Sequence, residues 1–265
     1  MNNRTGFFMG IILVLFVFTN CQKIGEYYVG LNLQPDMSKS TFDPGLNVFG
    51  VLKTGPDFDT INHFFEVQQL ISMQHYYDSL SVLDAAIALK RTVQNGEVQF
   101  YQPQSKGNGL YFDETIVTAP GDRWSYTCSF DTFEVTSECI VPNTPHLAGD
   151  ITLTGGNQLA FTVQADSTAF MYQLYVLSGE NFYLEKRIQQ KRSNTVYQVQ
   201  LPWTAGAEAI LVYLFAYDKN MVEYITTSNT FFKPNAFRPA FSTVEGGYGT
   251  FGAMSSNLFV VPSSN

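Results

Sequence analysis

Three histidines and three cysteines are the side chains in this sequence that could most readily perform chemistry. His63, His75 and His146 are widely spaced, and none belongs to a His-Glu-x-x-His motif, which places two zinc ligands on one face of a helix. The sequence also contains no Gly-x-Ser-x-Gly nucleophile elbow and no Walker-type phosphate loop. It therefore predicts no catalytic residue, no metal site and no cofactor, and we expect that the protein is not an enzyme.

Residues 57–62 and residues 218–223 each resemble part of a calcium-binding loop. Both segments carry Asp and Asn side chains at short spacing. Neither has the central glycine or the full set of oxygen ligands that such a loop requires. Because Asp and Asn also stabilise tight turns, we expect two turns here rather than two metal sites. Lys219 and Asn220 are predicted to form the turn of a hairpin whose second strand covers residues 222–227.

Cys128 and Cys139 lie in residues 123–130 and 133–140, two segments with the pattern of paired strands. The two cysteines are equally distant from residues 133 and 134, so we expect them to face each other across the hairpin and form a disulfide. Two free thiols are the alternative. No Cys-x-x-Cys spacing indicates a redox site, so the predicted bridge would be structural.

The third cysteine, Cys21, follows an unbroken apolar run at residues 7–18. This run is shorter than the roughly 20 residues that a membrane-spanning helix needs, and its position is typical of a secretory signal peptide. A cysteine directly after the run resembles a bacterial lipoprotein signal, which implies that residues 1–20 are cleaved and that Cys21 carries acyl chains as a membrane anchor. An ordinary signal peptide is the alternative, since Phe18 and Asn20 depart from the usual residues of the lipoprotein motif.

The composition of the 265 residues describes a globular and acidic protein. Hydrophobic residues make up 45% and charged residues 14%, which is too apolar for a disordered chain. Lys and Arg number 15 against 23 Asp and Glu, a net charge of −8. An acidic protein lacks the basic face that binds phosphates, so nucleic acid is excluded as an expected partner.

Short apolar segments separated by turn residues recur along the chain and predict an all-β fold. We expect two consecutive β-sandwich domains of the immunoglobulin-like or fibronectin type. The predicted organisation is a signal peptide at 1–20, a tether at 21–43, an N-terminal sandwich at 44–142, a linker at 143–150 and a C-terminal sandwich at 151–265. The boundary between the two sandwiches is indicated by residues 142–146, which contain two prolines.

The expected strands follow from apolar content and alternation along the chain. Residues 209–217 are apolar on both faces and predict a central strand. Residues 86–91 are assigned to a strand in preference to a helix, and residues 185–192 to a solvated connection in preference to a helix. The other expected strands cover residues 46–53, 64–71, 98–101, 110–117, 123–130, 133–140, 151–154, 159–164, 170–177 and 196–201.

A glycine-rich segment near the C-terminus formally matches a dinucleotide-binding fingerprint, but it lacks the strand–helix context of that motif. We expect a loop instead. Together with residues 45–50 and the signal-plus-cysteine start, this segment resembles the Bacteroidetes exported lipoproteins grouped as domain-of-unknown-function family 4249. The signature residues of the predicted loop are Gly246, Gly247, Gly249, Phe251 and Gly252.

That resemblance implies an outer-membrane lipoprotein, often encoded beside a TonB-dependent transporter, with no established catalysis. We therefore expect a non-enzymatic, lipid-anchored envelope protein that is an accessory or partner of an outer-membrane transporter or another envelope assembly, with its face of the membrane left open. A glycan- or peptide-binding module is the alternative. Exposed aromatic side chains would decide between them, and Trp124 and Trp203 are expected in the core or at an interface.

Overall fold

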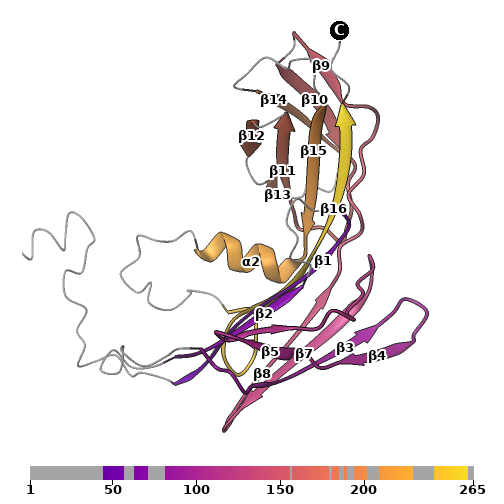
Figure 1. The fold of residues 1–265 in the computed structure, drawn as a ribbon. Coiled ribbons are helices and arrows are strands. Elements are labelled where there is room, and N and C mark those ends of the chain that lie inside the picture. The colour runs from indigo at the N-terminus through magenta and orange to yellow at the C-terminus, as the bar shows by residue number, and fades with distance from the viewer. Residues whose placement is uncertain are drawn as a thin grey trace, which may run out of the picture.

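Strands make up most of the described chain, as the alternating apolar pattern predicts (Figure 1). The computed structural model describes residues 44–56, 63–70, 81–155, 157–178, 181–184, 188–189, 194–201, 209–228 and 242–261. Among these residues, three sheets are formed and a helix, α2, covers Lys219–Ser228. The prediction of an all-β sandwich fold is confirmed.

A nine-stranded sheet runs through the whole molecule, in the order β12-β11-β15-β16-β1-β2-β6-β5, with β13 also paired to β11. It joins segments from both halves of the sequence. Its strands are β1 (Gly45–Thr54), β2 (Phe64–Leu70), β5 (Gln104–Gly107), β6 (Leu110–Phe112), β11 (Met171–Ser178), β12 (Asn181–Leu184), β13 (Ile188–Gln189), β15 (Ile210–Tyr217) and β16 (Tyr248–Val261).

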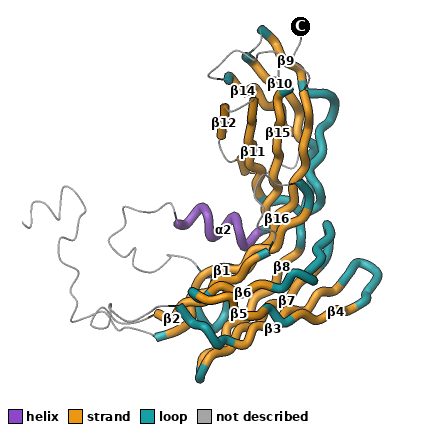
Figure 2. The backbone as a smooth tube through the Cα atoms, in the orientation of Figure 1, coloured by secondary structure: helices purple, strands orange, loops and turns teal. Residues whose placement is uncertain are grey.

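Two smaller sheets complete two sandwiches at opposite ends of the long sheet (Figure 2). At one end lies the order β4-β3-β7-β8, formed by β3 (Ala86–Thr92), β4 (Val98–Tyr101), β7 (Arg123–Phe130) and β8 (Phe133–Ile140). At the other end lies β14-β10-β9, formed by β9 (Thr152–Thr154), β10 (Gln158–Val163) and β14 (Thr195–Gln200). The bounds agree closely with most predicted strands, whereas β6 ends at Phe112 rather than at residue 117.

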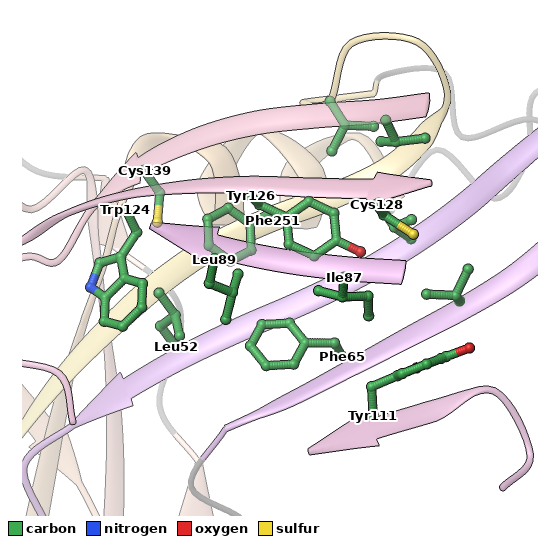
Figure 3. Packing of buried hydrophobic residues seen from close by; sticks show 14 of the residues in the cluster. Leu52, Phe65, Ile87, Leu89, Tyr111, Trp124, Tyr126, Cys128, Cys139 and Phe251 are labelled. Carbon is green, nitrogen blue, oxygen red and sulfur yellow. The ribbon is translucent and has the colours of Figure 1, made fainter. Parts of the chain in front are cut away.

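The first sandwich buries large aromatic side chains from both of its sheets (Figure 3). Phe65 and Phe251 come from the long sheet, and Trp124 and Tyr126 come from β7; all four are at most 1% exposed. The rings of Tyr126 and Phe251 stack with centroids 4.9 Å apart. Phe64, the neighbour of Phe65, points to the opposite face of the sheet, as expected for consecutive residues of a strand.

The second sandwich has its own core of mostly aliphatic side chains. Leu159 and Phe161 on β10 pack against Leu174 on β11 and Val212 on β15, and all four are buried. Strand β15 lies between β11 and β16, which confirms the central position predicted for residues 209–217. Val261, the last residue of β16, also belongs to this core.

The glycine-rich tail is a central strand of the long sheet, and the predicted loop is wrong from Tyr248 onward. The first part of β16 pairs in parallel with β1, and its second part pairs antiparallel with β15. A Cβ atom at Gly249 would run into the main-chain carbonyl of Val48, so only glycine allows this close pairing. Gly246 and Gly247, which precede the strand, pack as closely against β8.

Because β16 runs the length of the sheet, it contributes to both cores: Phe251 and Ala253 to the first, and Val261 to the second. The division of the chain into domains at residues 143–150 stays a prediction. The structure adds that the C-terminal strand completes the N-terminal sandwich.

Residues 219–228 form helix α2, so the hairpin turn at Lys219 and Asn220 and the strand at 222–227 are wrong predictions. Met221, Val222 and Ile225 share one face of the helix and pack on the outer side of the long sheet. Their content of β-branched residues favoured a strand, yet their spacing fits a helix equally well. Burial of this face decides in favour of the helix.

Cys128 and Cys139 are free thiols, and the predicted disulfide is wrong. The hairpin has a tight turn at Asp131 and Thr132, with Asp131 at a φ of 53°, and this sets the register. Cys128 consequently faces Val135, and Cys139 faces Trp124. Figure 3 shows the two sulfur atoms at opposite ends of the core, separated by aromatic rings.

Candidate functional site

A crevice of about 450 Å³ lies at the junction of the two sandwiches, beside the start of α2. The start of β7 and the end of β8 line one side, and the segment at residues 167–170 lines the other. Two half-exposed apolar side chains, Ile140 and Phe170, stand at its rim with exposed fractions of 43% and 44%. The crevice also gathers the charged side chains of Arg123, Glu138, Asp218 and Lys219.

Asp218 is the buried acidic group of this crevice, and it caps helix α2. Its Oδ1 accepts a hydrogen bond from the main-chain N–H of Met221 at 2.9 Å, the geometry of an N-cap residue. Its own N–H donates to the carbonyl of Ala253 on β16 at 3.0 Å. A Cβ atom on Gly252 would lie 2.8 Å from Oδ1, so the glycine makes room for the carboxylate against the sheet.

Burial raises the pKa of Asp218 to about 7. Hydrogen bonds from the backbone of Met221, Ala253 and Asn220 favour the charged form and oppose this shift, whereas the nearby Glu223 adds to it. The carboxyl group therefore changes its charge close to neutral pH. Since its Oδ1 already holds the first turn of α2, its established role is structural.

Cys139 lines the same crevice but is not an activated nucleophile. Burial raises its pKa well above the ordinary value, and the negative charges of Asp218 and Glu138 raise it further. Burial likewise raises the pKa of Cys128 to about 11. Both thiols stay protonated at neutral pH, whereas nucleophilic cysteines need a lowered pKa.

Asn220 ties the two layers together at the floor of the crevice. Its side-chain amide donates to the carbonyl of Glu138 on β8 at 2.8 Å and to the carbonyl of Phe251 on β16 at 2.9 Å. The Nζ of Lys219 lies 3.6 Å from a carboxylate oxygen of Glu223, one turn further along α2. The described lining thus holds polar groups that could contact a charged side chain of a ligand or partner, without a paired nucleophile and base.

The other residues considered for chemistry do not converge. His63 accepts a hydrogen bond from the N–H of Lys53 at its Nδ1, and burial lowers its pKa to about 4, so it is neutral. His146 is exposed, whereas His75 and Cys21 lie outside the described residues. Within the described part of the chain, no group of three or more His, Cys, Asp or Glu side chains could hold a metal ion.

The tryptophans and the charged segments at 57–62 and 185–192 are not among the described residues that line the junction crevice. Trp124 is fully buried, as expected, and Trp203 lies outside the described residues. The acidic segment at 57–62 and most of the basic segment at 185–192 are also outside them. Among the described residues, no helix has the length and apolar character needed to cross a membrane. The role of Asp218 was missed, although an Asp before apolar residues at helical spacing is an N-cap signal.

The fold defines this chain as an all-β protein with two sandwich cores. No family model matches it, and no curated protein matches it. Among solved structures, it is similar to a two-domain fibronectin type-III segment of chicken tenascin, with 9% identity, a TM-score of 0.28 and coverage of 83% of this chain and 98% of that one. The FN1-FN3 domains of chicken CNTN1 match with 9% identity and a TM-score of 0.28 over 83% of this chain and 67% of that one. The chicken interferon gamma receptor alpha chain matches with 10% identity and a TM-score of 0.26 over 84% and 100%. Nothing about the activity or partner of this chain follows from these similarities.

Proposed function

We propose that this chain is a non-enzymatic, lipid-anchored protein of the outer membrane that binds a protein partner, such as a TonB-dependent transporter or another envelope assembly. The observation that carries the proposal is the position of Cys21 directly after the apolar run at residues 7–18. The other two cysteines add nothing to the proposal, because both are free and buried.

The chemistry of the junction crevice supports a binding role over a catalytic one. Its buried carboxyl group caps a helix, and its thiol is held in the protonated form. Catalysis by either group would need a partner that activates it. A glycan-binding role is less favoured, because Trp124, the described tryptophan, packs in the core and is fully buried.

Membrane fractionation of a Cys21→Ala variant tests the anchor. The wild-type chain is expected in the outer-membrane fraction, and the variant is expected to be released from it. Mass spectrometry of the wild-type N-terminal peptide provides the second readout, with acyl chains expected on Cys21. A variant that stays in the membrane fraction, or a mature N-terminus without fatty acid, would overturn the proposal.

A further inference from the structure

A groove of about 470 Å³ lies at the edge of the first sandwich, away from the junction crevice. One wall is the start of β3 with the residues just before it, and the other wall is the segment at residues 102–105. Thr127 and Ser129, on the outer face of β7, also contribute to the lining. The groove therefore lies where the two sheets of the sandwich separate.

The start of β3 is an unpaired strand edge in this groove. Strand β7 pairs with β3 along its whole length, from Ala86 to Thr92. On the other side, β4 pairs only with Leu89–Thr92. Within the described part of the chain, no strand pairs with residues 86–88 on that side. A strand edge of this kind offers main-chain donors and acceptors to an added strand.

Pro103 explains why β4 does not continue along this edge. A proline has no main-chain N–H and cannot extend a ladder, so it occurs where strands end. After Tyr101 the chain passes through Pro103 and enters β5, which pairs with β6 in the long sheet. The groove is the space that this change of sheet leaves beside β3.

The edge is held in place by Tyr111 of β6. Its hydroxyl donates to the carbonyl of Val82 at 2.9 Å and accepts from the N–H of Ala85 at 2.8 Å. Tyr111 is only 1% exposed, so this contact fixes the segment before β3 from inside the sandwich. Binding at a fixed edge costs less conformational entropy than binding at a mobile one.

Side chains in the groove indicate the chemistry of the occupant. Ala86, Ala88 and Ser129 are short, which leaves space above the strand for side chains of an added segment. Asp84 is the carboxylate of the lining, it is exposed, and none of the described residues forms an ion pair with it. Charge complementarity therefore favours a segment that carries Lys or Arg.

We propose that residues 86–88 bind an extended segment of a partner protein as an added β-strand, with a basic side chain of that segment beside Asp84. The inference rests on the proposed partner-binding function and names the surface and the chemistry of recognition. Binding at residues 86–88 is measured on the purified chain, whereas the lipid anchor is tested by substitution of Cys21. The two proposals can therefore fail separately.

Phage display of short random linear peptides tests the docking site. The peptides are selected in parallel against the purified full chain and against a Ser129→Arg variant. The long arginine side chain fills the groove without changing β3. Ser125→Arg is the matched control, because Ser125 lies on the same strand and on the same face as Ser129 but outside the groove lining. Circular dichroism of all three proteins confirms that each is folded.

We expect the selected peptides to contain Lys or Arg. They should bind the wild-type chain and Ser125→Arg equally, and Ser129→Arg at least about tenfold more weakly. Asp84→Lys is expected to weaken the same peptides by a similar factor, and amide hydrogen exchange should slow at residues 86–88. Failure to enrich any peptide, or equal binding to Ser129→Arg, would overturn the proposal. Self-association of the wild-type chain that Ser129→Arg abolishes would also overturn it, because the occupant would then be a second copy.

Discussion

Arg91 and Asp122 form an ion pair inside the first sandwich, with the guanidinium Nε and a terminal nitrogen each 2.7 Å from the same carboxylate oxygen, Oδ2. The residues are only 8% and 1% exposed. The same oxygen accepts the N–H of Ala119 at 2.8 Å, and the guanidinium also donates to Gln99 at 3.1 Å. The pair thus fixes the loop before β7 to strand β3.

Removal of one partner of this pair is expected to be strongly destabilising. Asp122→Ala leaves the Arg91 guanidinium buried without its counter-charge, which costs about 3–5 kcal/mol in the free energy of unfolding. Urea unfolding followed by circular dichroism measures this change. Glu223→Ala is the control, since it removes a partly exposed ion pair with Lys219 and is expected to cost less than about 0.5 kcal/mol. Equal effects of the two substitutions would contradict the assignment.

The raised pKa of Asp218 makes stability depend on pH. In the folded chain the pKa of the Asp218 carboxyl group is about 7, whereas its ordinary value is 3.8. The contribution of the group is therefore fully present below the ordinary pKa and is lost as the pH rises through about 7. Asp218→Asn keeps a good N-cap and removes the titration. Denaturant titrations of both proteins from pH about 4 to about 8 should show the wild type losing stability relative to the variant. Parallel curves would exclude Asp218 as the group responsible.

Gly252 is expected to be intolerant of a side chain. Its Cβ would lie 2.6 Å from Cγ of Met221 and 2.8 Å from Oδ1 of Asp218, both buried, so Gly252→Ala must shift these side chains or the start of α2. Overpacking of this kind costs about 1–3 kcal/mol. The same substitution in a Met221→Ala background should cost less, because the contact with Met221 is gone and only the contact with Oδ1 of Asp218 remains. Additive effects in this double-mutant cycle would show that the two residues do not press on each other.

The cysteine pair provides a direct test of the hairpin register. With Cys128 opposite Val135, a reducing agent should leave the melting temperature unchanged. Both thiols should react with a labelling reagent only after unfolding, since both are buried. If the two thiols of the unfolded protein react with the label only after reduction, they were joined in a disulfide, and the two cysteines face each other instead.

Local pattern was sufficient for most of the fold, and it failed at the turn that sets a hairpin register and where long-range contacts decide the structure. The arms of the cysteine hairpin and the central strand β15 follow from alternation and apolar content. The register of the hairpin depends on a tight turn at Asp131, which the positions of the cysteines did not reveal. Met221 and Ile225 became helical because a sheet face was available to bury them.

The candidate site was less accessible to sequence reasoning for the same reason. Asp218 and Cys139 approach each other only through the packing of α2 on β16 and β8. The groove beside β3 depends on Pro103 carrying the chain from one sheet to the other. Neither arrangement corresponds to a fixed spacing along the chain.

Strand β16 also determines how the molecule can come apart. The hydroxyl of Ser256 on this strand donates to the carbonyl of Thr54, 202 positions away in the chain. On the same strand, Ala253 packs into the first core and Val261 into the second. Loss of one strand would therefore open both halves together, and heat or force should unfold them in one cooperative step. The ribosome must release this strand before either half can close.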